Sequence, residues 1–556
     1  MTSEPPILER IRASVIGEDS VMRGPFGPRR VTYADYTASG RALTFLEDFI
    51  RDAVLPAYAN THTESSGTGL QTTRLREDAR RVIRDAVHGD DSTCVIFAGS
   101  GCTGAIDRLV GILNMRIPAD LDARYGLSDT IPADERPVVL IGPFEHHSNE
   151  LPWRESIADL VTIPEDRDGH VDLEALEAAL RTYVDRPLVI GAFSAASNVT
   201  GILTDTEAVT ELLHQYGALA VWDYAAAAPY VDIDMHPGNP AIAKDAVVLS
   251  PHKFVGGPGT PGVLIIRRGL LANSVPAVVG GGTVAYVNAE EHVYLDDPVH
   301  REEAGTPAII ESIRAGLVFQ LKQAVGVDTI KSREETLLKR VISSWSEHPR
   351  IDILGNPNVD RLSIVSFTIR GTQGGYLHHN AVVAILNDLF GIQARGGCSC
   401  AGPYGHRLLG IDLDQSHAYE QQIRQGCEGI KPGWVRVNFN YFVEDAVADY
   451  IIEAVLLLAE SGERLLPLYR FDPLTGRWTH RGGPIEPPLR LTDVDYDATG
   501  EMTYPRVQER LPLSALEEHL REAREILAAL APLEDTARVN ADFDVLRWFP
   551  LPAASL

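Results

Sequence analysis

Residues Val247–Arg267 read VVLSPHKFVGGPGTPGVLIIR, and the rest of the chain is best understood outward from this stretch. A short apolar run, Val247–Leu249, leads to Lys253, and a second apolar run, Val263–Ile266, follows a cluster of glycines and prolines. Such runs predict two strands joined by a tight link. Partial desolvation of Lys253 would favour the neutral amine that a Schiff-base lysine needs. Taken alone, the window also fits a surface lysine in a hairpin.

The bulk properties of the chain are those of a large, acidic globular protein. Its 556 residues suffice for two or more domains, and no apolar run approaches the length of a membrane span. The formal net charge of -27 would repel nucleic acids and anionic membranes. Five cysteines and an N-terminus without an export signal favour a reducing setting. We therefore expect a cytoplasmic protein with a small-molecule substrate and neither a nucleic-acid nor a membrane partner.

Apolar strand patterns and amphipathic helix patterns alternate through the first 330 residues. Strands are expected at 93–97, 138–141, 188–193 and 219–222, and helices at 71–88, 172–182 and 205–216. This alternation predicts a mostly parallel α/β sheet, in which ligands bind beyond the carboxyl ends of the strands. Polar residues follow those ends repeatedly, at Ser100–Thr103, His146, Asn198, Asp223 and Lys253.

Composition and periodicity divide the chain into four parts. They are an N-terminal tail (1–30), a large domain (31–330), a smaller α/β domain (331–460) and an appended segment (461–556). In the smaller domain we expect strands at 364–369 and 435–439, helices at 378–389 and 443–459, and a loop at 394–406. The appended segment, with a helix at 513–530, looks ordered enough to pack on the core.

The groups at the strand ends match the needs of pyridoxal phosphate. Lys253 can supply a Schiff base, Asp223 can pair with a protonated ring nitrogen, and His146 can stack on a flat ring. The loop Ala98–Ile106 (AGSGCTGAI) lies between a strand and a helix, an arrangement that offers backbone N–H groups to a phosphate. The loop has neither Walker nor dinucleotide spacing, so a plain strand-to-helix turn is its alternative interpretation.

In the order of their motifs, residues 31–455 resemble the class V aminotransferase family of fold-type I pyridoxal-phosphate enzymes. Within that family they are most similar to group II cysteine desulfurases and selenocysteine lyases. The motifs are GCTG (101–104), EHHSNELPW (145–153), SNVTG (197–201), SPHK (250–253) and EAGTP (303–307). The resemblance implies a large domain with a mostly parallel sheet, a smaller α/β domain and a homodimer with shared active sites.

The resemblance also implies a role for each motif residue. Lys253 would be the imine lysine. The other cofactor contacts would be Asp223 at the ring nitrogen, His146 on the ring, Asn198 near the phenolic oxygen, and Cys102, Thr103, Ser250 and His252 at the phosphate. Thr306 would reach the phosphate of the other subunit. Ala226 stands where desulfurases commonly have a glutamine.

The motif RGGCSCAGPYG (395–405) carries the chemistry that the resemblance implies for the substrate. Arg395 would bind the substrate carboxylate, beside Asn198, through its planar fork. Cys400, five residues later, would take the substrate sulfur as a persulfide and leave alanine. Cys398 could relay that sulfur, form a reversible disulfide with Cys400, or be the nucleophile itself. Cys398, Cys400 and His406 could alternatively bind a metal, but three donors without CxxC spacing are a weak pattern, so we predict no metal site.

The function we predict is cleavage of the C–S bond of L-cysteine or a related amino acid, with a possible sulfur-acceptor protein as partner. The alternatives are a β-lyase acting on a cysteine conjugate, an aminotransferase, and a non-catalytic sulfur carrier. We also expect Cys94 in the core, and His378 and His379 at the start of a surface helix.

Overall fold

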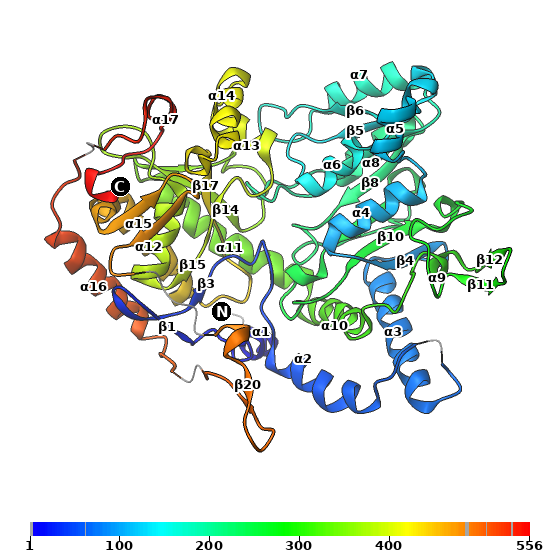
Figure 1. Cartoon of the computed structure of the whole chain (residues 1–556), viewed down its shortest axis with the longest axis horizontal. Helices are drawn as coiled ribbons and strands as arrows, with labels where there is room; N and C mark the ends of the chain where they lie inside the picture. The colour runs from blue at the N-terminus through cyan, green and yellow to red at the C-terminus, as the bar shows by residue number, and fades with distance from the viewer. Residues whose placement is uncertain (1–3, 62, 484–488, 507–508, 535–536) are drawn as a thin grey trace. The chain divides into compact units, whose positions relative to one another are not determined.

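The computed structural model describes residues 4–61, 63–483, 489–506, 509–534 and 537–556, which form two compact units (Figure 1). The first unit takes the described residues of Met1–Ile16, Thr37–Arg333 and Asn358–Leu362. The second takes those of Gly17–Tyr36, Glu334–Pro357 and Ser363–Leu556. Residues 17–36 and the C-terminal extension from 461 onward therefore both belong to the second unit.

The first unit is built on a seven-stranded sheet in the order β4-β10-β9-β8-β7-β5-β6. Neighbouring strands are parallel except at β10, which runs antiparallel to both β4 and β9. The mostly parallel sheet expected from the sequence is confirmed, with β6 as an additional edge strand. The strands are β4 (Thr93–Ala98), β5 (Val138–Ile141), β6 (Asp159–Thr162), β7 (Val189–Ser194), β8 (Leu219–Asp223), β9 (Ala246–Leu249) and β10 (Gly262–Arg267).

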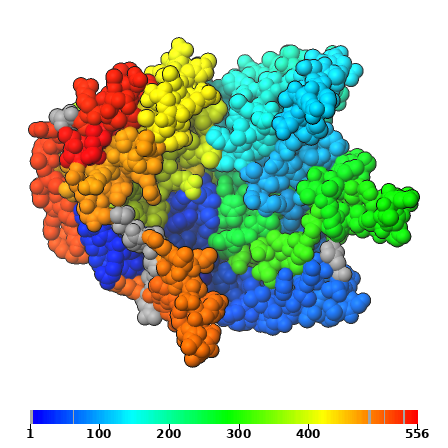
Figure 2. All heavy atoms as spheres, viewed as in Figure 1, coloured from blue at the N-terminus to red at the C-terminus, as the bar shows by residue number. Residues whose placement is uncertain are grey.

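Helices cover the sheet because its strands are apolar on both sides. On one face of the sheet, side chains such as Ile96, Val248 and Leu264 form a buried cluster with helix α4. Helix α3 contacts β4, α8 contacts β8, and α10 packs on α3. The helices of this unit are α1 (Pro6–Arg12), α2 (Thr44–Phe49), α3 (Gly67–Ala86), α4 (Gly101–Ile112), α5 (Ala119–Tyr125), α6 (Leu151–Arg154), α7 (Leu173–Tyr183), α8 (Thr206–Gln215), α9 (Pro298–Arg301) and α10 (Ile309–Val325). A hairpin of β11 (Val284–Val287) and β12 (His292–Tyr294) projects from the unit (Figure 2).

The second unit contains a four-stranded antiparallel sheet in the order β13-β14-β17-β16. Its strands are β13 (Ile351–Ile353), β14 (Ile364–Ile369), β16 (Arg395–Gly397) and β17 (Trp434–Asn438). The helices are α12 (His379–Phe390), α13 (Gly402–Leu408), α14 (Leu413–Arg424), α15 (Asp445–Ser461), α16 (Ala515–Ala529) and α17 (Ala541–Leu546). Helix α11 (Val327–Ser346) begins in the first unit and ends in this one.

Short paired strands complete the second unit. The pairs are β1 (Val21–Gly24) with β2 (Gly27–Arg30), β3 (Thr32–Tyr33) with β15 (Ile392–Gln393), β18 (Tyr469–Asp472) with β19 (Arg477–His480), and β20 (Asp495–Tyr496) with β21 (Met502–Thr503). The first pair lies where the sequence suggested only a polar tail. In the described residues, no helix is both long enough and apolar enough to cross a bilayer.

The C-terminal extension is part of the core of the second unit. Helix α16 contacts α12 and α15, and the ring of Trp548 stacks on those of His378 and His379, with centroids 5.3 and 5.8 Å apart. The prediction that these two histidines begin a helix is confirmed, with His378 as the N-cap of α12. The prediction that they lie on the surface is wrong, because the extension covers them and leaves them 2% and 6% exposed.

Candidate active site

The carboxyl ends of five strands meet at one edge of the large sheet. Strands β5, β7, β8 and β9 are mutually parallel, and β4 shares their direction because both β4 and β9 are antiparallel to β10. Asp223 ends β8, Ser250 follows β9, and Gly101 opens α4 just after β4. The topology therefore brings together residues that lie far apart in the sequence, as ligand sites of α/β sheets require.

The start of α4 forms a cradle suited to an anion. The backbone N–H of Cys102 donates to Ser250 Oγ at 2.9 Å. A Cβ atom on Gly101 would lie 2.8 Å from His252 Cε1 and 2.9 Å from Ser250 Oγ. Only glycine at this position therefore lets residues 250–253, which carry Lys253, lie this close to the start of α4. The first N–H groups of a helix lack intrahelical acceptors, and the positive end of the helix dipole favours a phosphate here.

Asp223 is a buried carboxyl beside this cradle. Its Oδ1 accepts the N–H of Ala225 at 2.7 Å, and the residue is only 4% exposed. Burial raises the pKa of Asp223, while the positive charge of Lys253 and the Cys102 thiol act in the opposite direction. Burial also raises the pKa of the Cys102 thiol, so this thiol stays protonated. A protonated ring nitrogen would give the Asp223 carboxylate the partner that burial otherwise denies it.

The lysine turn is held by close backbone approaches. Strand β9 leads into a single 3₁₀ turn, Pro251–Lys253, and the carbonyl oxygen of His252 accepts the N–H of Gly40 at 2.8 Å. A Cβ on Gly40 would lie 1.8 Å from Phe254 O, which makes Gly40 necessary. Burial and the nearby Lys253 lower the pKa of His252 to about 4. His252 would therefore contact a phosphate as a neutral N–H donor.

His146 and Thr103 extend this edge. The N–H of Ser148 donates to His146 Nδ1 at 3.0 Å, so in the neutral ring the proton sits on Nε2. The Ser148 hydroxyl lies 2.6 Å from Thr103 Oγ1 and links the histidine loop to α4. Asn198 is buried in the loop that follows β7.

Glu145 is a site residue that the sequence reasoning missed. Its carboxylate accepts Ser194 N and Oγ at 2.9 and 2.6 Å and Asn149 Nδ2 at 2.6 Å. It also accepts the N–H of Gly142, and burial raises its pKa to about 7. Glu145 thus ties the end of β5 to the end of β7 and orients the loop carrying His146. A glutamate directly before that histidine was the available signal.

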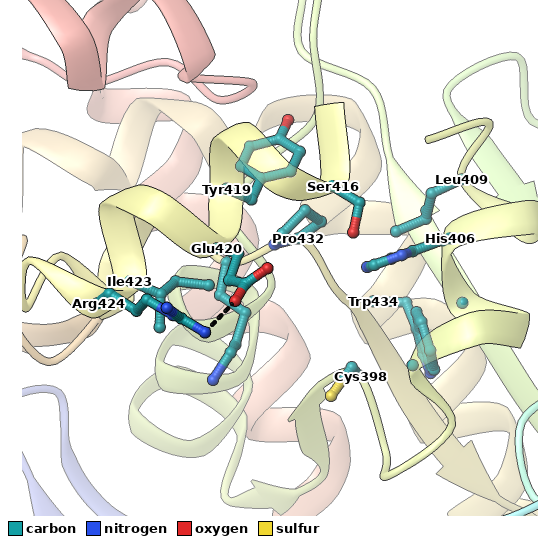
Figure 3. A pocket seen from close by; sticks show the side chains of 13 residues that line it. Cys398, His406, Leu409, Ser416, Tyr419, Glu420, Ile423, Arg424, Pro432 and Trp434 are labelled. Atoms are coloured by element: carbon teal, nitrogen blue, oxygen red, sulfur yellow. Dashed lines mark ion pairs between the residues drawn. The ribbon is translucent and has the colours of Figure 1, made fainter. Parts of the chain in front are cut away.

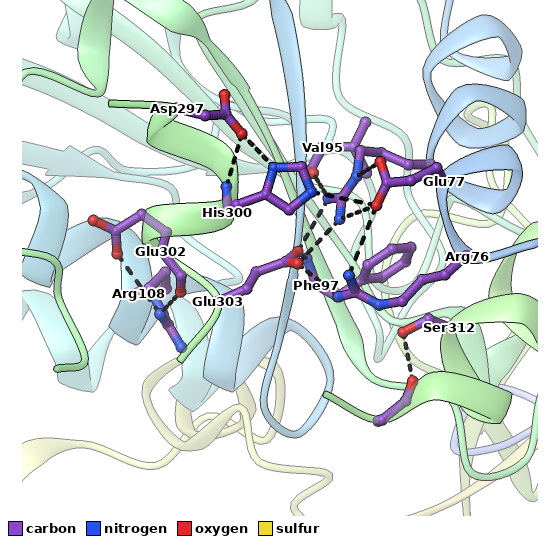
Figure 4. Close-up of polar contacts among 12 residues, drawn as sticks. Arg76, Glu77, Val95, Phe97, Arg108, Asp297, His300, Glu302, Glu303 and Ser312 are labelled. Atoms are coloured by element: carbon purple, nitrogen blue, oxygen red, sulfur yellow. Dashed lines mark hydrogen bonds and ion pairs between the residues drawn. The ribbon is translucent and has the colours of Figure 1, made fainter. Parts of the chain in front are cut away.

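An ion-pair network fixes the EAGTP loop within the first unit (Figure 4). Glu303 is buried, accepts Arg76 Nη2 at 2.6 Å and Arg80 Nη2 at 3.0 Å, and also accepts the N–H of Phe97 at 2.7 Å. The attraction of both arginines outweighs burial and lowers the pKa of Glu303 to about 2. Asn60 Nδ2 lies 3.5 Å from Thr306 Oγ1 at the tip of the loop.

In the second unit, Arg395 belongs to a charge cluster that the sequence did not predict. Arg395 on β16 lies directly across from Arg436 on β17, and like charges in that position repel. Asp35 relieves the repulsion, because its Oδ2 accepts Arg395 Nε at 3.0 Å and its Oδ1 accepts Arg436 Nη2 at 3.2 Å. Burial lowers the pKa of Arg436, while about half of the Arg395 side chain is exposed.

The two thiols of the RGGCSCAGPYG motif lie in one tight turn. The N–H of Ala401 donates to the carbonyl of Cys398 at 3.1 Å. Between them, Ser399 and Cys400 have φ of 49° and 56°, a left-handed conformation that costs a non-glycine residue free energy. Cys400 is exposed and Cys398 half-buried. The predicted loop 394–406 is thus wrong in part, since it holds the strand β16, this turn and most of α13.

No metal site is evident at this motif. Among the described residues, no three His, Cys, Asp or Glu side chains are grouped to hold an ion, so the alternative with Cys398, Cys400 and His406 gains no support. Cys94 is buried in the core as predicted.

A family model described as aminotransferase class-V matches residues 32–424. The chain belongs to the class-V aminotransferase family. This match covers most of the chain and confirms the resemblance inferred from the motifs.

Several curated proteins with similar sequences are named probable cysteine desulfurase. One from Halobacterium salinarum is 29% identical over 410 residues, covering 73% of this chain and 88% of that protein. One from Halalkalibacterium halodurans is 27% identical over 377 residues, covering 67% and 84%.

Solved structures support the predicted fold of this class-V family member. The apo cysteine desulfurase from Thermococcus onnurineus aligns with a TM-score of 0.64 at 23% identity, over 81% of this chain and 98% of its own. A cysteine desulfurase from Escherichia coli aligns with 0.59 at 19% identity, over 77% and 94%. At such identities the likeness concerns the fold alone.

The residues at the strand ends fit pyridoxal phosphate, the cofactor that the class-V aminotransferase family implies. The first unit offers an anion cradle at a helix start, a buried carboxyl at a strand end and a lysine next to it. These are the three groups that the cofactor's phosphate, ring nitrogen and aldehyde need.

Proposed function

We propose that this protein is a pyridoxal-phosphate-dependent cysteine desulfurase. The observation that carries the proposal is the exposed thiol of Cys400, held on a left-handed turn five residues after Arg395 in a class-V aminotransferase chain. Non-glycine residues held in such strained conformations cluster at functional sites. The names of the curated relatives support the same activity.

In this proposal the first unit prepares the α-carbon of the substrate. Pyridoxal phosphate, when bound, accepts the electron pair released at that carbon. Asp223 would hold a proton at the ring nitrogen, and the start of α4 with Ser250 and His252 would bind the phosphate. His146 would lie against the ring and Asn198 near its oxygen. Lys253 Nζ would take the proton from the α-carbon and return it.

Residues of the second unit would bind the carboxylate and take the sulfur. The guanidinium of Arg395 suits a carboxylate because its parallel N–H groups match both oxygens. Asp35 orients that guanidinium through its Nε. The thiolate of Cys400 would attack the substrate sulfur, so that a new S–S bond forms, the C–S bond breaks and L-alanine leaves. The reaction balances as cysteine plus a protein thiol giving alanine plus a protein persulfide.

The remaining features of the proposal concern assembly and setting. We propose a homodimer in which Thr306 contacts the phosphate held by the other subunit, with the loop braced by Glu303. A reducing cytoplasm would keep the five thiols free, as they are in the structure. Sedimentation of the holoenzyme as a monomer would contradict the dimer without touching the chemistry.

Product analysis tests the activity directly. Holoenzyme mixed with L-cysteine and a reductant should release alanine and sulfide in equal amounts. Cys400→Ala should reduce sulfide release at least a hundredfold, whereas Cys427→Ala, at a half-buried thiol outside the motif, should match the parent. Pyruvate and ammonia in place of alanine would make the protein a β-lyase, an outcome in which Cys400→Ala has no effect.

A further inference from the structure

A pocket in the second unit contains Cys398 in its wall (Figure 3). Its volume is about 310 Å³. Because a water molecule occupies about 30 Å³ of liquid, the pocket has room for a ligand of roughly ten non-hydrogen atoms. Helix α14, an element with no assigned role so far, forms one side of the pocket. Cys398 is therefore a half-buried residue that lines a built cavity, whereas Cys400 is exposed.

The surface of the pocket is mostly apolar, and its two cationic side chains are each paired with a glutamate. Leu409, Ile423 and Trp434 contribute apolar surface. Arg424 and Lys431 are each neutralised by a glutamate, through Glu420 at 2.7 Å and Glu428 at 2.8 Å. Such a lining disfavours a charged ligand and accepts an uncharged, largely apolar one.

The pocket also contains a side chain that can accept the proton of a thiol. Figure 3 shows the imidazole of His406 directed into the pocket, with Cys398 at its edge. Burial lowers the pKa of His406, so the ring is neutral and can accept a proton at physiological pH.

We propose that Cys398 is a second sulfur carrier, which receives the sulfur from Cys400 and hands it to a small uncharged thiol in this pocket. The inference rests on the proposed desulfurase function. The Cys398 thiolate attacks the outer sulfur of the Cys400 persulfide, a new S–S bond forms to Cys398, and the old one breaks with Cys400 leaving as thiolate. One thiol proton is released and one is taken up, and no external oxidant is needed.

The turn keeps the two cysteines close together along the chain. Their Cα atoms can be at most about 7 Å apart, and the hydrogen bond from Ala401 N–H to the Cys398 carbonyl folds the segment more tightly. An outer sulfur reaches about 2 Å beyond Cys400 Sγ. The acceptor thiol would then attack the outer sulfur on Cys398 in the same way, leaving as a small-molecule persulfide and restoring the Cys398 thiol.

Mass spectrometry on the unmodified sequence provides the first test. Holoenzyme is mixed with one equivalent of L-cysteine, alkylated and digested, and the peptide carrying both thiols is fragmented. We expect one extra sulfur atom on Cys398 in part of the molecules, and none on Cys398 in Cys400→Ala. Alanine formation with sulfur on Cys400 alone would overturn the relay but leave the desulfurase. Sulfur on Cys398 in Cys400→Ala would overturn the order of transfer, and absence of alanine would overturn both proposals.

A pocket-filling variant tests where the acceptor binds. Ser416→Phe adds a ring inside the pocket, and His417→Phe adds the same ring on the exposed face of α14. The ratio of sulfur transfer to 1-propanethiol over transfer to glutathione should fall at least tenfold in the first variant and stay unchanged in the control. Labelling of Cys398 by N-phenylmaleimide, which needs no bound cofactor, should slow likewise. Equal ratios and equal labelling rates in both variants would overturn the role of the pocket.

Discussion

Replacing Glu303 by glutamine keeps the shape of the side chain and removes its charge. The carboxylate is buried between Arg76 and Arg80, and the attraction of these arginines outweighs burial and lowers its pKa from 4.5 to about 2. A shift of that size corresponds to about 3 kcal/mol of stability at neutral pH. Removing one partner of a buried ion pair costs a similar amount, about 3–5 kcal/mol. Glu303→Gln should therefore lose about 3 kcal/mol of unfolding free energy at pH 7.

The pH dependence gives this prediction its sign. Because the folded-state pKa of Glu303 is depressed, its contribution is complete above the unfolded-state pKa near 4.5 and declines as the pH falls toward 2. In urea titrations, the difference between parent and Glu303→Gln should shrink by about 2 kcal/mol between pH 7 and pH 3. The exposed control Glu290→Gln should behave as the parent at both pH values. A loss below about 1 kcal/mol at pH 7, or one that does not change with pH, would refute the reasoning.

Three further changes probe the rest of the molecule. His378→Ala removes a buried ring that stacks on Trp548 of the C-terminal extension, and it should lower the free energy of unfolding in urea by about 2–3 kcal/mol. His417→Ala, on the exposed face of α14, should leave this free energy almost unchanged. Equal losses in the two variants would mean that the extension only rests on the surface. Asp35→Asn leaves Arg395 and Arg436 without their shared carboxylate and should lower the free energy of unfolding by about 3 kcal/mol. It should also raise the KM for L-cysteine. An unchanged KM would show that Asp35 has no part in substrate binding. Burial raises the pKa of Glu145 to about 7, so its carboxyl takes up a proton on folding, and the unfolding free energy should fall by up to about 3 kcal/mol between pH 4.5 and pH 8. In Glu145→Gln the free energy of unfolding should depend less on pH over this range. If it falls as steeply in the variant as in the parent, the pH dependence belongs to another group.

The sequence by itself determined the large sheet and most of its ligand edge. Apolar runs such as Val247–Leu249 are buried on both faces, so their periodicity and their bounding glycines identify them locally. Asp223 ends such a run and Lys253 follows another after a short turn, and parallel strands present their carboxyl ends at one edge. The class-V motifs could be recognised for the same reason, because each is a continuous stretch of chain.

Tertiary structure alone decided which distant residues became partners. The pairing of Arg395 with Arg436, and the place of Asp35 between them, follow from strand register, which a three-residue strand rich in glycine does not encode locally. The burial of His378 depends on Trp548, which lies far along the chain in a segment without clear periodicity. Burial and register are properties of the packed chain, and they place Asp35 in a charge cluster and His378 in a core.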